Sequence, residues 1–229
     1  MCIRDRWLPT SLLGLVLLQA LLGMWTVTWL LKPVVVMAHL LGGFSIFALL
    51  FVLLLRVSDD QAHYADTRLR WFAGLSLVIL IGQIALGGWT STNYAALACT
   101  DFPTCQNQWW PNMDFAEGFV LWRGIGVNYE FGVLEHPART AIHMTHRLGA
   151  LITLVCLGSF ALVLLRRGQP LAMIGLRIGF VLILQIVLGI CNVLFHLPLW
   201  VAVAHNVTAA ILLLTVIQAN YVLRPRKLS

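Results

Sequence analysis

Charge is scarce in this sequence, and its long apolar runs contain no acidic residue. Only 10% of the 229 residues are charged, whereas 60% are hydrophobic, and the mean hydropathy is +0.87. A soluble domain has about a quarter charged residues and about half apolar ones, so this composition excludes an ordinary soluble globular protein. The chain is therefore predicted to be an integral membrane protein.

Six apolar runs have the length of a transmembrane helix, which needs about 20 residues to cross a bilayer. The predicted spans are 9–31, 34–55, 71–92, 141–165, 174–195 and 199–222. This pattern predicts an all-α fold, a polytopic membrane bundle of six transmembrane helices.

The net charge of +6 does not indicate a nucleic-acid partner, because of where the charges lie. Basic residues gather before the first span, at 56–70, at 166–177 and after the last span. The segment 91–140 holds five acidic residues against only Arg123 and Arg139. The positive-inside rule then places both termini in the cytoplasm and the loop 91–140 outside, which is the periplasm for a cell inner membrane.

Two of the five cysteines, Cys99 and Cys105, fall in this outward loop. A disulfide persists outside the cytoplasm, so the loop is expected to be closed by a Cys99–Cys105 bridge. Free thiols or a transient redox pair are the alternatives. The cysteines within spans, Cys156 and Cys191, are expected to be packing residues.

The chain contains an internal repeat. A shift of 166 positions aligns QALLGMWTVTWLLKPVVVMAH (19–39) with QIVLGICNVLFHLPLWVAVAH (185–205) without a gap, and QIALG at 83–87 opens a third similar helix pair. Each pair has one histidine early in its second helix: His39, His146 and His205. The simplest explanation is a four-helix repeat without its opening pair, with 1–70 as the remnant of an N-terminal half and 71–229 as a C-terminal half.

The three histidines share one predicted depth in the membrane. Each lies five or six residues into its span, roughly 8–9 Å below the outer surface at 1.5 Å per residue. Imidazoles at equal height on facing helices can supply the two axial ligands of a haem iron, and His146 with His205 would form such a pair. His39 would need a partner from the missing helices, and zinc or copper fits less well because a closed site needs three or four ligands.

Other polar residues near this level have competing interpretations. Arg147 offers a forked cation suited to a haem propionate, or it is an anchor at the head-group level. His143 is a ligand or supports one, or it is a polar residue at the helix mouth. The remaining histidines are expected to be solvated or at the interface: His63, His136 and His196.

Three segments resemble heme A synthases of the proteobacterial type, membrane proteins that serve cytochrome oxidase assembly. They are LGGWTSTNYAALACTDFPTCQNQWWP at 86–111, TAIHMTHRLGAL at 140–151 and VAVAHNVTAA at 201–210. The similarity extends over nearly the whole chain from the first span onward, and it is most specific where the cysteine loop and the His-Arg dipeptide occur together.

This resemblance implies an eight-helix architecture of two pseudo-symmetric four-helix halves. It also implies an oxidoreductase that converts the C8 methyl of heme O to a formyl group. A b-type haem would be held by His146 and His205, and His39 would lie at the substrate-haem iron on the catalytic side. The expected partners are the haem substrate, membrane lipid, heme O synthase and an electron donor, with a homo-oligomer compatible with the sequence.

The sequence departs from the family in lacking the first two spans, together with their histidine and a nearby glutamate. The chain as given is therefore expected to be an incomplete form with little activity of its own. Two other functions remain open: a bis-histidine b-type cytochrome subunit for electron transfer, and a transporter that uses membrane histidines for proton coupling.

Overall fold

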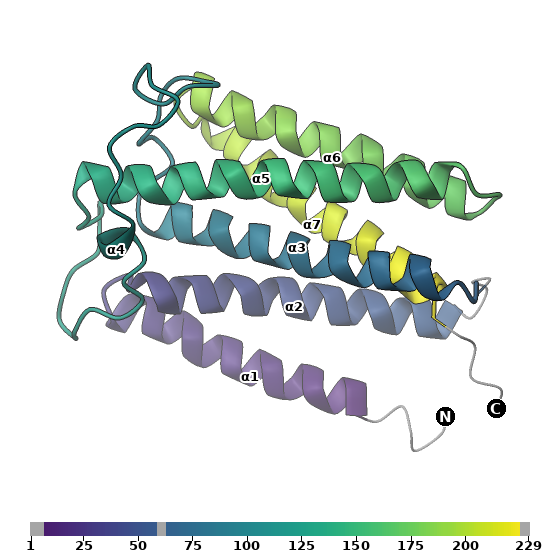
Figure 1. Cartoon of the computed structure of the whole chain (residues 1–229). Coiled ribbons are helices and arrows are strands. Elements are labelled where there is room, and N and C mark those ends of the chain that lie inside the picture. The colour runs from purple at the N-terminus through teal and green to yellow at the C-terminus, as the bar shows by residue number, and fades with distance from the viewer. Residues whose placement is uncertain (1–6, 59–62, 225–229) are drawn as a thin grey trace. The chain divides into compact units, whose positions relative to one another are not determined.

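A computed structural model describes residues 7–58 and 63–224 and shows a helical protein (Figure 1). The helices are α1 (Trp7–Thr28), α2 (Pro33–Ser58), α3 (Thr67–Thr92), α4 (Phe115–Gly118), α5 (His136–Leu165), α6 (Leu171–Leu194) and α7 (Leu199–Val222). All except α4 are long and apolar enough to cross a membrane. The predicted all-α bundle with six membrane spans is confirmed.

The chain divides into two compact units. The first contains Met1–Leu49, Ile84–Arg147 and Val193–Leu197, and the second contains Leu50–Gln83, Leu148–Asn192 and Pro198–Ser229. Each unit is described by itself below. The division into halves at 1–70 and 71–229 stays a prediction.

In the first unit, α1 and the beginning of α2 form an antiparallel helical hairpin (Figure 1). Its turn places Leu30 and Leu31 in the left-handed region, with φ of 52° and 60°. The amide of Leu31 donates to the carbonyl of Thr26 over 2.8 Å, which closes the end of α1. Pro33 then begins α2, at a position where its missing N–H has no intrahelical partner to lose.

The turn between α6 and α7 repeats this conformation. His196 and Leu197 have φ values of 56° and 62°, and they lie 166 positions after Leu30 and Leu31. Left-handed backbone is unfavourable for residues with a side chain, so two consecutive examples at equivalent positions are not a common accident. The sequence repeat is thus accompanied by a repeat of backbone conformation.

The loop between α3 and α5 folds back onto helical residues of the first unit. A buried cluster joins Trp89 of α3 to Ala138 and Ile142 of α5, with Ala95 and Leu134 from the loop. The indole Nε1 of Trp89 donates to the carbonyl of Gly118, the last residue of α4, over 2.9 Å. The long connection is consequently an ordered cap with its own apolar core.

In the second unit, α5 and α6 are in close contact at Gly175. A methyl group at this position would lie 2.7 Å from the carbonyl oxygen of Ala161 and 2.8 Å from Cβ of Leu164. Small residues permit such close approach in membrane bundles. Elsewhere in the unit, the Asn220 amide donates to the Ala73 carbonyl over 2.9 Å, and the Cys156 thiol contacts the Ser76 hydroxyl at 3.7 Å.

Candidate functional site

Each of the three repeated histidines lies against the glycine of its own helix pair. A methyl group at the glycine would lie 3.1–3.2 Å from Cε1 of the imidazole in all three cases. The pairs are Gly23 with His39, Gly87 with His146, and Gly189 with His205. Since contacts this short are rare for a real Cβ, a side chain at any of these glycines would push the imidazole away. The sequence showed the repeat, and the structure shows that it builds the same local arrangement three times.

A glutamine precedes each of these glycines by one helical turn, on the same face of the helix. Gln19 Nε2 donates to the backbone carbonyl of His39 over 2.7 Å. Gln185 Nε2 lies 3.2 Å from Nε2 of His205, within hydrogen-bonding distance. The glutamine is thus in contact with the histidine residue in both the α1–α2 pair and the α6–α7 pair.

The polar atoms around these two histidines are incompletely paired. Buried without a hydrogen-bond partner are Nδ1 of His39 and of His205, and Oε1 of Gln19 and of Gln185. Buried polar atoms are normally satisfied, so a cluster of unpaired ones indicates a site that receives a further group. Imidazole nitrogens are common axial ligands of haem iron, and these residues therefore fit the predicted cofactor.

A compact metal ion has less support within residues 7–58 and 63–224. No group of three or more histidine, cysteine, aspartate or glutamate side chains is placed there to hold one. His39 and His146 belong to the first unit and His205 to the second, and the pairing of His146 with His205 at one iron stays a prediction.

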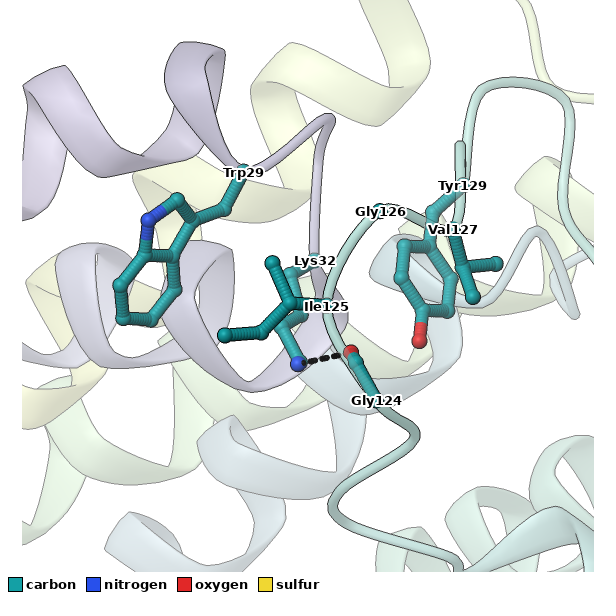
Figure 2. Close-up of a pocket in the computed structure, with 7 residues that line it drawn as sticks. All are labelled: Trp29, Lys32, Gly124, Ile125, Gly126, Val127 and Tyr129. Atoms are coloured by element: carbon teal, nitrogen blue, oxygen red, sulfur yellow. Dashed lines mark hydrogen bonds between the residues drawn. The ribbon is translucent and has the colours of Figure 1, made fainter.

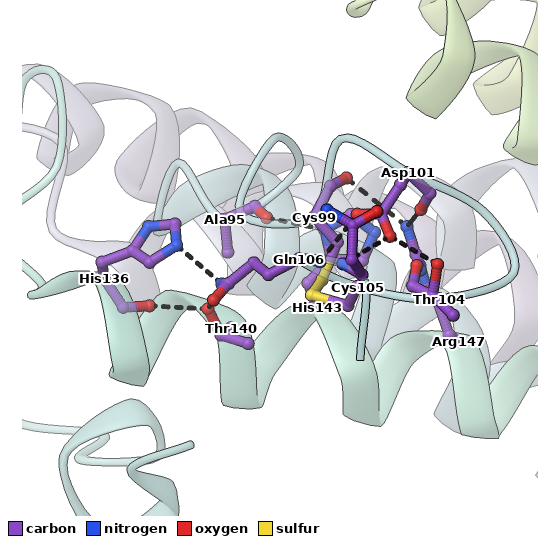
Figure 3. The surroundings of a disulfide bond; sticks show 11 residues. Ala95, Cys99, Asp101, Thr104, Cys105, Gln106, His136, Thr140, His143 and Arg147 are labelled. Carbon is purple, nitrogen blue, oxygen red and sulfur yellow. Dashed lines mark hydrogen bonds between the residues drawn. A yellow bond between two sulfur atoms is a disulfide. The ribbon is translucent and has the colours of Figure 1, made fainter. Parts of the chain in front are cut away.

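The polar residues in the first turns of α5 form a polar stripe, consisting of His136, Thr140, His143 and Arg147. Their spacing of four, three and four residues places them on one face of the helix, and Figure 3 shows all four side chains directed toward the disulfide-containing loop. Gln106 of that loop contacts the stripe twice, with its Nε2 2.7 Å from His136 Nε2 and 3.1 Å from the Thr140 hydroxyl. The polar stripe is therefore a docking face for the loop.

His143 and Arg147 complete this docking. His143 is only 4% exposed, and its Nδ1 lies 3.0 Å from the carbonyl oxygen of Ala95. Arg147 donates to the carbonyls of Thr104 and Asp101, each over 2.8 Å (Figure 3). The structure therefore shows His143 as a buried residue that holds the loop. The Nε of Arg147 is buried without a partner, and its predicted contact with a propionate stays a prediction.

The docked loop is closed by a disulfide between Cys99 and Cys105. The carboxylate of Asp101 organises the turn inside this loop. It accepts from the Thr104 hydroxyl at 2.6 Å and from the backbone N–H groups of Gln106 at 2.7 Å and Asn107 at 3.0 Å. These bonds favour the ionised carboxylate, first among them the one from Thr104, and they lower the pKa of Asp101 below its ordinary value. The bridge and the carboxylate together fix the loop in the form that the polar stripe binds.

Sequence reasoning missed Lys32, which lies at the end of the α1–α2 turn and is only 3% exposed. Its Nζ donates to the carbonyl of Gly124 over 2.6 Å (Figure 2) and lies 3.3 Å from the centroid of the Trp122 ring, a cation–π contact. A cavity of about 10 Å³ adjoins it, which is room for about one water molecule and far too little for haem. Lys32 thus connects the outer loop to the turn. The sequence feature that could have revealed this role is a single lysine between two long apolar runs.

Comparisons with known proteins identify the family of the chain. The family model of COX15-CtaA, described as cytochrome oxidase assembly protein, matches residues 4–217. A heme A synthase of Shewanella oneidensis is 50% identical over 219 residues, which is 94% of this chain and 66% of that protein. A heme A synthase of Erythrobacter litoralis is 31% identical over 77% of this chain and 47% of its own length. The chain spans slightly less than two thirds of the first relative and about half of the second.

Proposed function

The chain belongs to the COX15-CtaA family of cytochrome oxidase assembly proteins, and we propose that it acts in heme A synthesis as a membrane-embedded oxidoreductase. The proposed reaction converts the C8 methyl of heme O to a formyl group through two hydroxylations and the loss of water. Relatives that carry the name heme A synthase support this proposal. The six apolar helices and the family together make the chain a multi-pass membrane protein.

We assign the roles of the site residues as follows. His146 and His205 hold a b-type haem, and His39 binds the iron of the substrate haem on the catalytic side. When bound, the b-type haem supplies one-electron redox chemistry. The protein's own contribution is to orient the imidazoles on Gly87, Gly189 and Gly23, and the Gly–His arrangement common to the three helix pairs is the observation that carries the proposal.

Arg147 is the proposed partner of a haem propionate through its free Nε, while its two terminal nitrogens hold the loop. A guanidinium can serve both tasks because its five N–H groups point in different directions. The loop and the haem edge would then share one cation.

The proposed localisation is the cell inner membrane, with both termini cytoplasmic and the loop 91–140 periplasmic. The charge distribution supports this orientation, and a Cys99–Cys105 disulfide agrees with an oxidising compartment. We assign 71–229 to the half that holds the b-type haem and 1–70 to the substrate half. Heme O synthase, an electron donor and a second copy of the chain are the proposed partners.

Pigment analysis tests this function. The chain is produced together with heme O synthase and purified, and its haems are extracted and separated. We expect heme O or heme A in addition to haem b, and we expect His39→Ala to lose the former while it retains haem b. His196→Ala is the matched control, since His196 is exposed at a turn of the same conformation.

The other results identify the competing functions. A preparation that contains only haem b favours a b-type electron-transfer subunit. A preparation without any haem would contradict both haem functions and favour a transporter that uses its histidines for proton coupling.

A further inference from the structure

The disulfide-containing loop carries an uncharged segment with large exposed aromatic side chains. Residues 102–113 contain no charged residue, although the loop 91–140 as a whole has five acidic residues and two arginines. Trp109 is 74% exposed, Trp110 is 66% exposed, and Phe102 is exposed as well. An exposed apolar surface of this kind indicates contact with a membrane or with another molecule. The function proposed above does not use these side chains.

The contacts of the loop with α5 indicate the depth to which it extends. Arg147 donates to the carbonyls of Asp101 and Thr104, and it lies six residues after the apolar run of α5 begins at 141. With the outer membrane surface at the start of that run, the loop extends roughly 9 Å below the surface, at 1.5 Å per residue. The head-group layer on each side of a bilayer is about 5–8 Å thick. The loop therefore extends to the boundary between head groups and acyl chains.

The two tryptophans begin close to the same level. Cys105 packs with Met144 of α5 in a buried cluster, and its backbone pairs with that of Gln108 through hydrogen bonds of 2.9 and 3.0 Å. Trp109 follows directly in the chain, so its backbone lies about one helical turn of α5 closer to the outer surface than Arg147. Tryptophan is enriched at this level in membrane proteins, where the ring contacts lipid near the head groups.

The polar groups of the loop are paired within the protein at this level. Irregular backbone near acyl chains has little water to bond, and it is tolerated only where protein groups satisfy its carbonyls and amides. Arg147 binds two loop carbonyls, and the Asp101 carboxylate accepts three hydrogen bonds from its own turn (Figure 3). The disulfide-containing loop therefore meets the condition for a segment that enters the membrane surface.

We propose that residues 102–110 lie in the head-group region of the outer leaflet, with the side chains of Phe102, Trp109 and Trp110 against phospholipid. The indole suits this boundary because it combines an apolar ring with one N–H donor. The segment has no cation to select an anionic head group, so its partner is the phospholipid surface in general. This contact would anchor the cap over α5 to the membrane, and it is independent of the haem assignments.

Fluorine magnetic resonance of the purified full chain tests the contact. The chain is labelled with 5-fluorotryptophan and placed in nanodiscs of phosphatidylethanolamine and phosphatidylglycerol. Signal intensities are compared with and without two paramagnetic agents, a lipid with a nitroxide near its head group and a gadolinium chelate in the water. Trp109→Phe and Trp110→Phe assign the two signals. The references are Trp200, which is exposed in the first turn of α7, and Trp89, which is buried.

We expect the signals of Trp109 and Trp110 to lose more intensity with the lipid-bound agent than with the aqueous one, as Trp200 does, while Trp89 keeps its intensity with both. A greater loss with the aqueous agent at either indole overturns the proposal. So does an unchanged intensity with both agents, since protein would then cover the segment. If a phenylalanine variant does not accumulate, the corresponding tyrosine variant assigns the same signal. Failure of the haem assignments would leave these intensities unaffected.

Discussion

At the scale of single residues, the glycine beside each histidine decides how the imidazole sits. A glycine inside a helix usually lowers the stability of the helix, because replacement by alanine stabilises it by about 0.5–1 kcal/mol. At Gly87 the added methyl would lie 3.1 Å from Cε1 of His146. The gain in helix stability is therefore opposed by displacement of the proposed ligand.

Gly87→Ala is predicted to reduce the bound b-type haem per chain, because the imidazole of His146 must move by a few tenths of an ångström. The haem content of purified protein, from absorbance against protein concentration, measures the effect. Gly82→Ala in the same helix is the control, since nothing lies within 4 Å of a methyl group there. Equal haem content in the two variants would show that the Gly87–His146 contact is unimportant.

Asp101 gives a prediction for pH at the same scale. Its pKa in the folded protein is lowered from 3.8 by its hydrogen bonds, chiefly that from Thr104. The carboxylate therefore stabilises the loop fully above the unfolded-state pKa of about 4, and this contribution disappears as the pH falls through the lower, folded-state pKa. We expect no change in the loop between pH 7 and 5 and a loosening below about pH 4.

Amide hydrogen exchange at Gln106 and Asn107 can follow this transition, because both amides donate to the Asp101 carboxylate. Asp101→Asn provides the comparison, since it retains an acceptor oxygen but cannot titrate. The protection ratio between wild type and variant should change only in the acidic range. A ratio that changes equally between pH 7 and 5 would contradict the assignment to Asp101.

At the scale of elements, hydropathy predicted the spans well and their polar ends poorly. The span predicted at 141–165 is a helix from His136 to Leu165, and its missing first turn contains the polar residues His136 and Thr140. A hydropathy window detects apolar runs, whereas this turn is stabilised by contacts of Gln106 with both residues. These contacts join residues 30 or more positions apart, which no local pattern reveals.

The repeat was the most informative pattern for the site, but it did not reveal the polar stripe. Alignment of Gln, Gly and His predicted which residues belong together. The structure brings the glycine and the histidine together in all three helix pairs, and the glutamine contacts the histidine residue in the α1–α2 and α6–α7 pairs. His143 and Arg147 were interpreted through their nearness in sequence to His146, whereas both bond to loop carbonyls. Their spacing of four residues, shared with His136 and Thr140, was the available signal.

At the scale of the whole molecule, composition alone was enough to predict a membrane protein, because 60% hydrophobic residues cannot be buried in a soluble domain of this size. The function could not follow from composition, since bundles of apolar helices serve many activities. It required the resemblance carried by the cysteine loop and the His-Arg dipeptide, and the family match over residues 4–217 agrees with it.

The proposed orientation makes a prediction for the complete chain in its membrane. A fluorescent protein fused after residue 229 should fluoresce, because it folds in the cytoplasm, and alkaline phosphatase fused after residue 110 should be active, because it needs the periplasm. The controls exchange the two reporters: a fluorescent protein fused after residue 110 should not fluoresce, and alkaline phosphatase fused after residue 229 should be inactive. An active phosphatase at the C-terminus would reverse the assignment of the charged segments.

The proposed function depends first on His146 and His205 holding one b-type haem between them. Electron paramagnetic resonance of the oxidised, purified chain, together with its reduced-minus-oxidised absorbance, tests this most directly. We predict one low-spin haem with two imidazole ligands per chain, lost from both His146→Ala and His205→Ala and retained in His196→Ala. A bis-imidazole signal that survives in either of the first two variants would contradict the account.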